Sequence, residues 1–117
     1  MKKTLIIASV AFLVGACGAN LVQPIQADVE RGSDQFEGLT LNNLKEGKRL
    51  YEENCGLCHG KKKLDARTEE EWRDIVPRMT KKANGKRGEK VFTEEKEQIL
   101  LEYILVMKDA PKRDTEE

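Results

Sequence analysis

The feature that most constrains this chain is a short motif near its middle, Cys55-Gly56-Leu57-Cys58-His59. Two thiols separated by two residues can form thioethers with the two vinyl groups of a single haem. A histidine directly after the second thiol then supplies an axial nitrogen to the iron. His59 is the only histidine of the chain, so a second histidine ligand from the same chain is excluded. The motif therefore predicts one covalent haem c held by Cys55, Cys58 and His59.

Three other uses of the cysteine pair fit less well. A redox pair of the thioredoxin type lies near a βαβ pattern, and the sequence shows no strand alternation that would build one. A zinc site generally needs four ligands, and outside the motif the chain offers one further cysteine, Cys17, and no histidine. A structural disulfide between Cys55 and Cys58 leaves His59 without a role. Haem attachment is the interpretation that uses all three residues of the motif.

The N-terminus predicts export from the cytoplasm. Two lysines follow the first methionine, and residues 5–16 are apolar except for Ser9. This run is shorter than the roughly 20 apolar residues of a membrane-spanning helix and is typical of a signal peptide, here residues 1–16. Residues 13–17 (LVGAC) resemble the lipobox of bacterial lipoproteins, which implies that Cys17 is acylated and becomes the mature N-terminus. The alternatives are an ordinary signal peptide with an incidental cysteine, or an uncleaved anchor. All three predict an extracytoplasmic protein, at a periplasmic or outer cell-envelope face.

Charge and composition organise the rest of the chain. Its 21 basic residues balance 21 acidic ones, which gives no sign of a nucleic-acid partner. Residues 17–40 hold scattered glycines and polar residues without a sustained period, and predict a lipid-anchor cysteine followed by a flexible linker. The alternative is that part of this stretch, including Phe36 and Leu39, packs on the domain. Residues 41–109 form the predicted domain, which at about 70 residues usually needs a staple such as a cofactor. Residues 110–117 form a charged tail.

Three helices are predicted in this domain, so the fold class is all-α. In each helix apolar residues recur at spacings of three and four, and an asparagine or threonine can cap the first turn. A loop is expected over residues 84–88. The helices are expected from Asn42 or Asn43 to Asn54, from Thr68 onward with a kink or restart at Pro77, and from Thr93 to about Lys108.

Residues 42–108 resemble a class I cytochrome c. That family has an N-terminal helix with a glycine and an aromatic residue before the C-x-x-C-H motif, and a C-terminal helix that crosses it at a matching aromatic residue. The resemblance implies a small cytochrome c-like fold of about three helices around one haem, and an electron carrier rather than an enzyme. The matching residues are Gly47 and Tyr51 in the first helix and Leu100, Tyr103 and Ile104 in the last.

The resemblance also implies a methionine as the sixth ligand of the iron, since methionine is the usual partner in this family. Glu71-Trp72 followed by six residues and Met79 is similar to segments of some small bacterial cytochromes c in which the methionine is the proposed ligand. Met79 is therefore the predicted sixth ligand, and the alternative is that it is an ordinary core residue. Met107, in the third helix, is expected to take part in packing.

The expected function is electron transfer between extracytoplasmic redox protein partners, by a domain attached to the membrane through a lipid anchor. Two alternatives stay open. If Met79 does not bind the iron, the haem is five-coordinate and the protein is a sensor or gas-binding module. The chain could also be the haem subunit of a larger dehydrogenase or oxidase complex.

Overall fold

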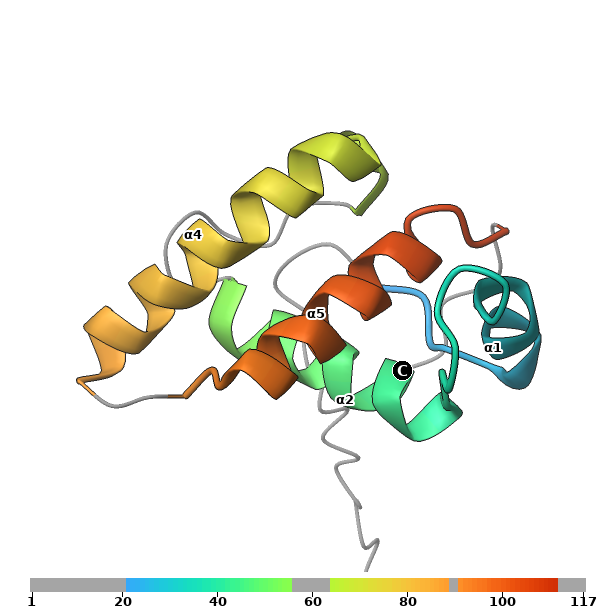
Figure 1. Cartoon of the computed structure of the whole chain (residues 1–117), viewed down its shortest axis with the longest axis horizontal. Coiled ribbons are helices and arrows are strands. Elements are labelled where there is room, and N and C mark those ends of the chain that lie inside the picture. The colour runs from blue at the N-terminus through green and yellow to red at the C-terminus, as the bar shows by residue number, and fades with distance from the viewer. Residues whose placement is uncertain (1–20, 56–63, 89–90, 112–117) are drawn as a thin grey trace, which may run out of the picture.

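The computed structural model describes residues 21–55, 64–88 and 91–111 of the chain. All regular structure in these ranges is helical, which confirms the predicted all-α class. Helix α5 packs against both α2 and α4, and α1 lies beside the C-terminal end of α5 (Figure 1). The elements are α1 (Gln26–Gly32), α2 (Leu41–Leu50), the π-helical turn η1 (Tyr51–Cys55), the 3-10 turn η2 (Leu64–Ala66), α4 (Glu69–Arg87) and α5 (Glu94–Met107).

Threonine hydroxyls cap three of these helices. Each hydroxyl accepts a hydrogen bond from a backbone N–H three residues along the chain, which otherwise has no partner in the first turn. The predicted starts at Thr68 and Thr93 are confirmed. The predicted start of the first helix at Asn42 or Asn43 is wrong, because Thr40 is the cap and accepts from the backbone N–H of Asn43 at 3.1 Å.

Helices α2 and α5 cross at Gly47. A Cβ atom added there would lie less than 3 Å from the Cβ of Tyr103 and 2.9 Å from the carbonyl oxygen of Ile99. Both obstacles belong to rigid parts of α5, so only glycine permits this approach. Tyr103 is fully buried in the contact. The predicted crossing of the two helices at Gly47 and Tyr103 is confirmed.

Helix α4 runs through Pro77 without restarting, so of the predicted kink or restart the restart is wrong. The proline ring is exposed, while Val76 and Ala83 on either side of it are buried against the core. Tertiary packing of the inner face thus outweighs the helical hydrogen bond that proline cannot make. The predicted loop over residues 84–88 is also wrong, because the helix continues to Arg87 and is capped by Gly88, which takes a left-handed conformation with φ of 67°.

The stretch before α2 packs on the domain, so the alternative stated for it is confirmed and the flexible linker is wrong for residues 21–40. Val29 of α1 and the following Phe36 and Leu39 are all buried in the common core. The remaining part of that prediction, residues 17–20, lies outside the described ranges. The folded body therefore extends N-terminally beyond the predicted boundary at residue 41.

A polar contact fixes α1 to the end of α5. The fully buried carboxylate of Asp28 accepts hydrogen bonds from the backbone N–H of Ile25 at 2.8 Å and from the Arg31 guanidinium at 2.7 Å. The same guanidinium donates to the carbonyl oxygen of Val106, also at 2.7 Å. Because a buried carboxylate is stable only when paired, this contact gives α1 a defined place. None of the described helices is long and apolar enough to cross a membrane.

Candidate functional site

The predicted site residues lie partly inside and partly outside the described ranges. Cys55 is the last residue of η1, and Met79 belongs to α4. Cys17, Cys58 and His59 lie outside the described residues. The geometry of the site therefore comes from the elements that flank the motif.

The chain enters the motif through a widened helical turn. Helix α2 ends at Leu50, and Tyr51–Cys55 form a π-helical turn instead of continuing the α-helix. Such turns are rare and occur frequently at functional sites, because the longer hydrogen-bonded ring changes the rotation of the chain. The prediction of a regular helix to Asn54 did not include this turn, and the apolar periodicity carries no signal for it. Its consequence is that the backbone at Cys55 is rotated relative to a regular continuation of α2.

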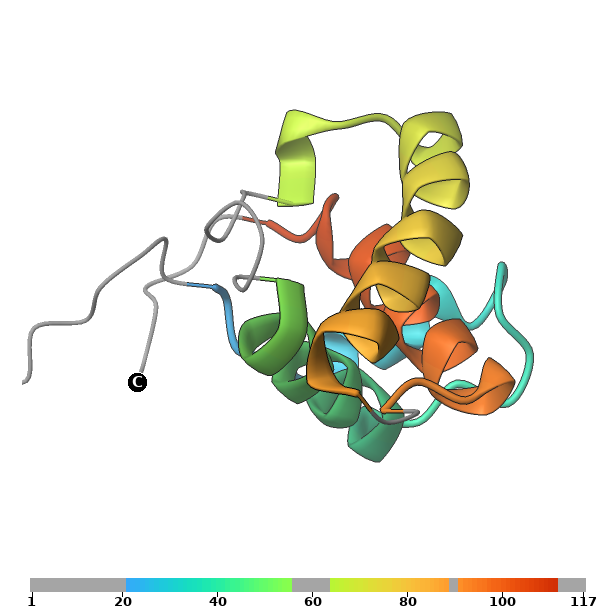
Figure 2. The ribbon, with the colours of Figure 1, turned by 90° about the vertical axis from the view of Figure 1, so that its left-hand side faces the viewer.

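Trp72 connects the two chain segments on either side of the motif. Its ring meets that of Tyr51 edge to face, with centroids 6.4 Å apart and planes at 74°. Its indole N–H donates a buried hydrogen bond of 2.8 Å to the carbonyl oxygen of Leu64. Tyr51 opens η1 and Leu64 opens η2, and Figure 2 shows both turns on the same side of α4. The segments before residue 56 and after residue 63 are thus both fixed to one buried side chain.

Tyr51 extends this contact into the crossing of α2 and α5. Its ring centroid lies 6.2 Å from that of Tyr103, with the planes tilted by 54°. Tyr51, Trp72 and Tyr103 are each nearly or completely inaccessible to solvent. The motif is consequently approached by a chain that is rigidly supported by the main helix contact of the molecule.

Asn54 is a buried polar residue next to Cys55, and its acceptor finds no donor among the described residues. Only 4% of Asn54 is exposed. Its Nδ2 donates to the carbonyl oxygen of Leu50 at 3.0 Å, whereas its Oδ1 has no hydrogen-bond partner among the residues that the structure describes. A buried acceptor left unpaired costs about 1–3 kcal/mol, and buried polar atoms in proteins are therefore almost always paired. We expect a donor beside Cys55, and the backbone and imidazole N–H groups of a haem-attachment turn are donors of this kind.

The two candidate methionines differ in burial. Met107 is 5% exposed and belongs to the core, as expected. Met79 is half-buried on the inner side of α4, where it packs against the core at its edge. The half-buried side chain of Met79 can turn its sulfur toward a group at the core edge, whereas Met107 is enclosed by the core. Burial therefore favours Met79 over Met107 as a ligand.

Charged side chains near these elements form exposed ion pairs. The Arg49 guanidinium donates to Glu46 at 2.9 Å and to Glu53 at 2.6 Å, and its hydrogen bond lowers the pKa of Glu46. The pKa of Glu71 is likewise lowered, first by a hydrogen bond with the backbone of Thr68 and then by one with its side chain. Exposed pairs of this kind contribute little to stability. Within residues 21–55, 64–88 and 91–111, no group of three or more His, Cys, Asp or Glu side chains is placed to hold a metal ion.

Comparison with known proteins identifies no relative of this chain. No protein-family model, no curated protein and no solved structure matches this chain. The motif, the unpaired acceptor of Asn54 and the half-buried Met79 are the observations that bear on function.

Proposed function

We propose that this chain carries one covalent haem c and works as an electron-transfer protein outside the cytoplasm. Cys55 and Cys58 would form the two thioethers, and His59 and Met79 would be the axial ligands. The observation that carries the proposal is the C-x-x-C-H motif, whose first residue, Cys55, is the last residue of the widened turn Tyr51–Cys55. When bound, the haem supplies a one-electron Fe(III)/Fe(II) couple.

Apolar residues next to the motif are compatible with this proposal. Tyr51, Trp72 and Val76 are buried in the core beside the elements that lead to and from the motif. Apolar surroundings and a thioether ligand would both raise the reduction potential of a haem. Asn54 offers its buried Oδ1 to an N–H donor beside Cys55.

We favour electron transfer over gas binding because Met79, half-buried on α4, could serve as a sixth ligand. It lies on the same face of α4 as Val76 and Trp72, three residues after the former. A methionine in the sixth position leaves no open coordination site for a gas or a peroxide. The electron-transfer proposal therefore depends on Met79, whereas haem attachment depends on the motif alone.

The membrane attachment is proposed separately, from the signal sequence. Cys17 would carry the lipid anchor after removal of residues 1–16, and the domain would meet its redox protein partners outside the cytoplasm. Mass spectrometry of the native N-terminus decides this part without reference to the haem.

Optical spectroscopy of the full chain, produced together with a cytochrome c maturation system, tests the haem and its ligands. The pyridine haemochrome should be of the c type. The oxidised protein should show the weak long-wavelength band of iron–methionine ligation. Met79→Ala should abolish this band, whereas the matched variant Met107→Ala should keep it. If the band survives in Met79→Ala, the ligand assignment is wrong. A five-coordinate spectrum in the native chain would support the gas-binding alternative instead.

A further inference from the structure

The folded body begins only a few residues after the proposed anchor. Leu21 and Val22 pack against the core, and Pro24 is fully buried. Only residues 18–20 separate Cys17 from this body. The tether between lipid and domain is therefore far shorter than the flexible linker that the sequence predicts.

The reach of this tether follows from backbone dimensions. Each residue spans at most about 3.3–3.6 Å, so the four steps from Cys17 to Leu21 reach about 14 Å when fully extended. A flexible chain from Cys17 to Leu41 would have reached about 80 Å when extended, with a root-mean-square length of about 25–30 Å. Docking of residues 21–40 thus removes most of the freedom of the domain to move away from the lipid.

The docked segment is fastened by contacts that resist release. Arg31 joins the buried carboxylate of Asp28 to the carbonyl oxygen of Val106. A Cβ added at Gly32 would come within 2.7 Å of side-chain atoms of both Leu39 and Val106, so α1 also sits very close to the end of α5. The tether can become longer only if residues 21–40 leave the domain. That would break the contacts between α1 and α5, which we expect to remain intact in the folded protein.

We propose that the short tether holds the domain directly against the lipid surface, with residues 21–25 and α1 at the membrane-facing end. This inference rests on the proposed acylation of Cys17. Ile25, at this end, is 42% exposed and is a large apolar side chain that can contact the lipid interface. The redox partner that fits such a domain is a membrane-bound protein whose electron-exchange site lies close to the lipid surface.

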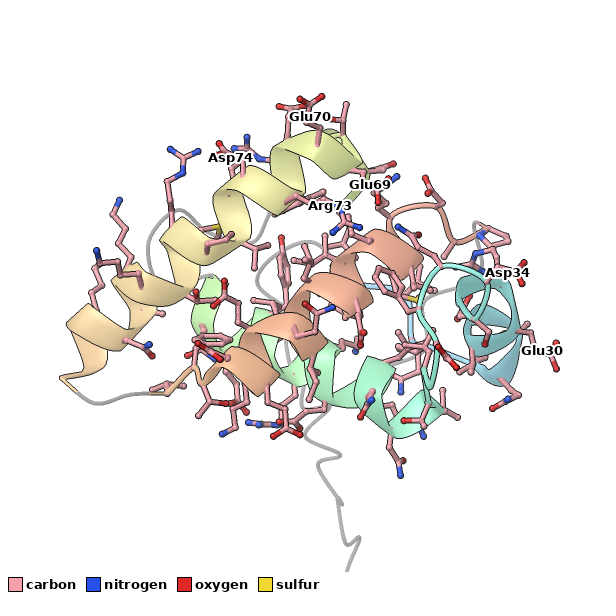
Figure 3. All side chains as sticks on the ribbon, viewed as in Figure 1. Glu30, Asp34, Glu69, Glu70, Arg73 and Asp74 are labelled. Atoms are coloured by element: carbon pink, nitrogen blue, oxygen red, sulfur yellow. The ribbon has the colours of Figure 1, made fainter. Side chains whose placement is uncertain are left out.

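The covalent anchor, and not charge, supplies the attraction in this arrangement. Glu30 of α1 and Asp34, two residues after its end, are both exposed at this end of the domain (Figure 3). Acidic side chains are not attracted to anionic lipid headgroups, which bind clusters of basic residues instead. This end of the domain should therefore not bind anionic vesicles in the absence of the acyl group.

Neutron reflectometry of the acylated, haem-loaded chain on a supported bilayer tests the inference. The protein layer should adjoin the headgroups without a layer of solvent between them. A flexible Gly/Ser segment of about 20 residues inserted between Asn20 and Leu21 should separate the two layers by roughly 25 Å. The same segment inserted after Pro111, at the other end of the described chain, should leave no gap.

A second variant uses the contact that fastens α1. Asp28→Ala removes the buried acceptor of Arg31 and should loosen the segment at the end of α5. Where hydrogen exchange shows that residues 21–32 are released while α2, α4 and α5 stay protected, a solvent layer should open. If a chain released in this way shows no gap, docking of α1 does not set the distance and the inference is wrong. A solvent gap beneath the native acylated chain overturns the inference and leaves the haem proposal intact. An unacylated native N-terminus overturns both the inference and the proposed anchor.

Discussion

The helix crossing at Gly47 gives the sharpest quantitative prediction. In Gly47→Ala the new Cβ must displace the Cβ of Tyr103 and the carbonyl oxygen of Ile99, which lies 2.9 Å from it. Because neither atom is the end of a flexible side chain, the two helices have to separate. Overpacking of this kind costs about 1–3 kcal/mol, and rigid obstacles place it near the upper end. Alanine regains about 1 kcal/mol of helix propensity. We expect the free energy of unfolding to fall by about 2 kcal/mol.

Thermal unfolding of the haem-loaded protein, followed by far-UV circular dichroism, measures this change. A loss of about 2 kcal/mol lowers the Tm of a domain of this size by roughly 10 °C. Gly85→Ala on α4 is the matched control, because an added Cβ there meets nothing within 4 Å. It should raise the stability by up to about 1 kcal/mol. If both variants raise the Tm, α2 and α5 do not approach as closely as described, and the reasoning is refuted.

Three further predictions concern the surroundings of the motif. Trp72→Phe removes the donor to the carbonyl oxygen of Leu64 and should lower the free energy of unfolding by about 1–3 kcal/mol; an unchanged urea midpoint would contradict it. Asn54→Leu should destabilise the haem-loaded protein by a similar amount, about 1–3 kcal/mol, if a donor occupies the buried Oδ1; a stabilised variant would show that no donor is there. The pKa of Glu71 is lowered in the folded state by Thr68, so its stabilising effect is present above the ordinary value of 4.5 and is lost as the pH falls through the lower folded pKa. Glu71→Gln should therefore flatten the acid limb of a Tm-against-pH curve slightly, and an identical limb would refute this assignment.

Local signals in the sequence predicted the helix starts at Thr68 and Thr93. A threonine hydroxyl that accepts from the third backbone N–H is a local device, so it can be read without knowing the fold. The crossing at Gly47 and Tyr103 could also be predicted, because a family pattern joins two distant positions. The burial of Met107 followed from its place in an apolar helix.

The parts that were missed depend on contacts between distant residues. Docking of α1 relies on Arg31 reaching the carbonyl oxygen of Val106, 75 residues away, and no local pattern encodes this bond. Helix α4 continues through Pro77 because its inner face is buried, so tertiary packing overrides the local preference. The π-helical turn at Tyr51 changes the helical pitch for only five residues, too few to alter the apolar periodicity.

The central claim is that Cys55 and Cys58 bind one haem covalently. Mass spectrometry of the proteolytic peptide that contains residues 55–59, taken from the chain as its native host produces it, tests this claim directly. We predict a single haem attached to one peptide through both cysteines, with no thiol left to alkylate. A peptide that carries two alkylatable thiols or an internal disulfide, and no haem, would contradict the account.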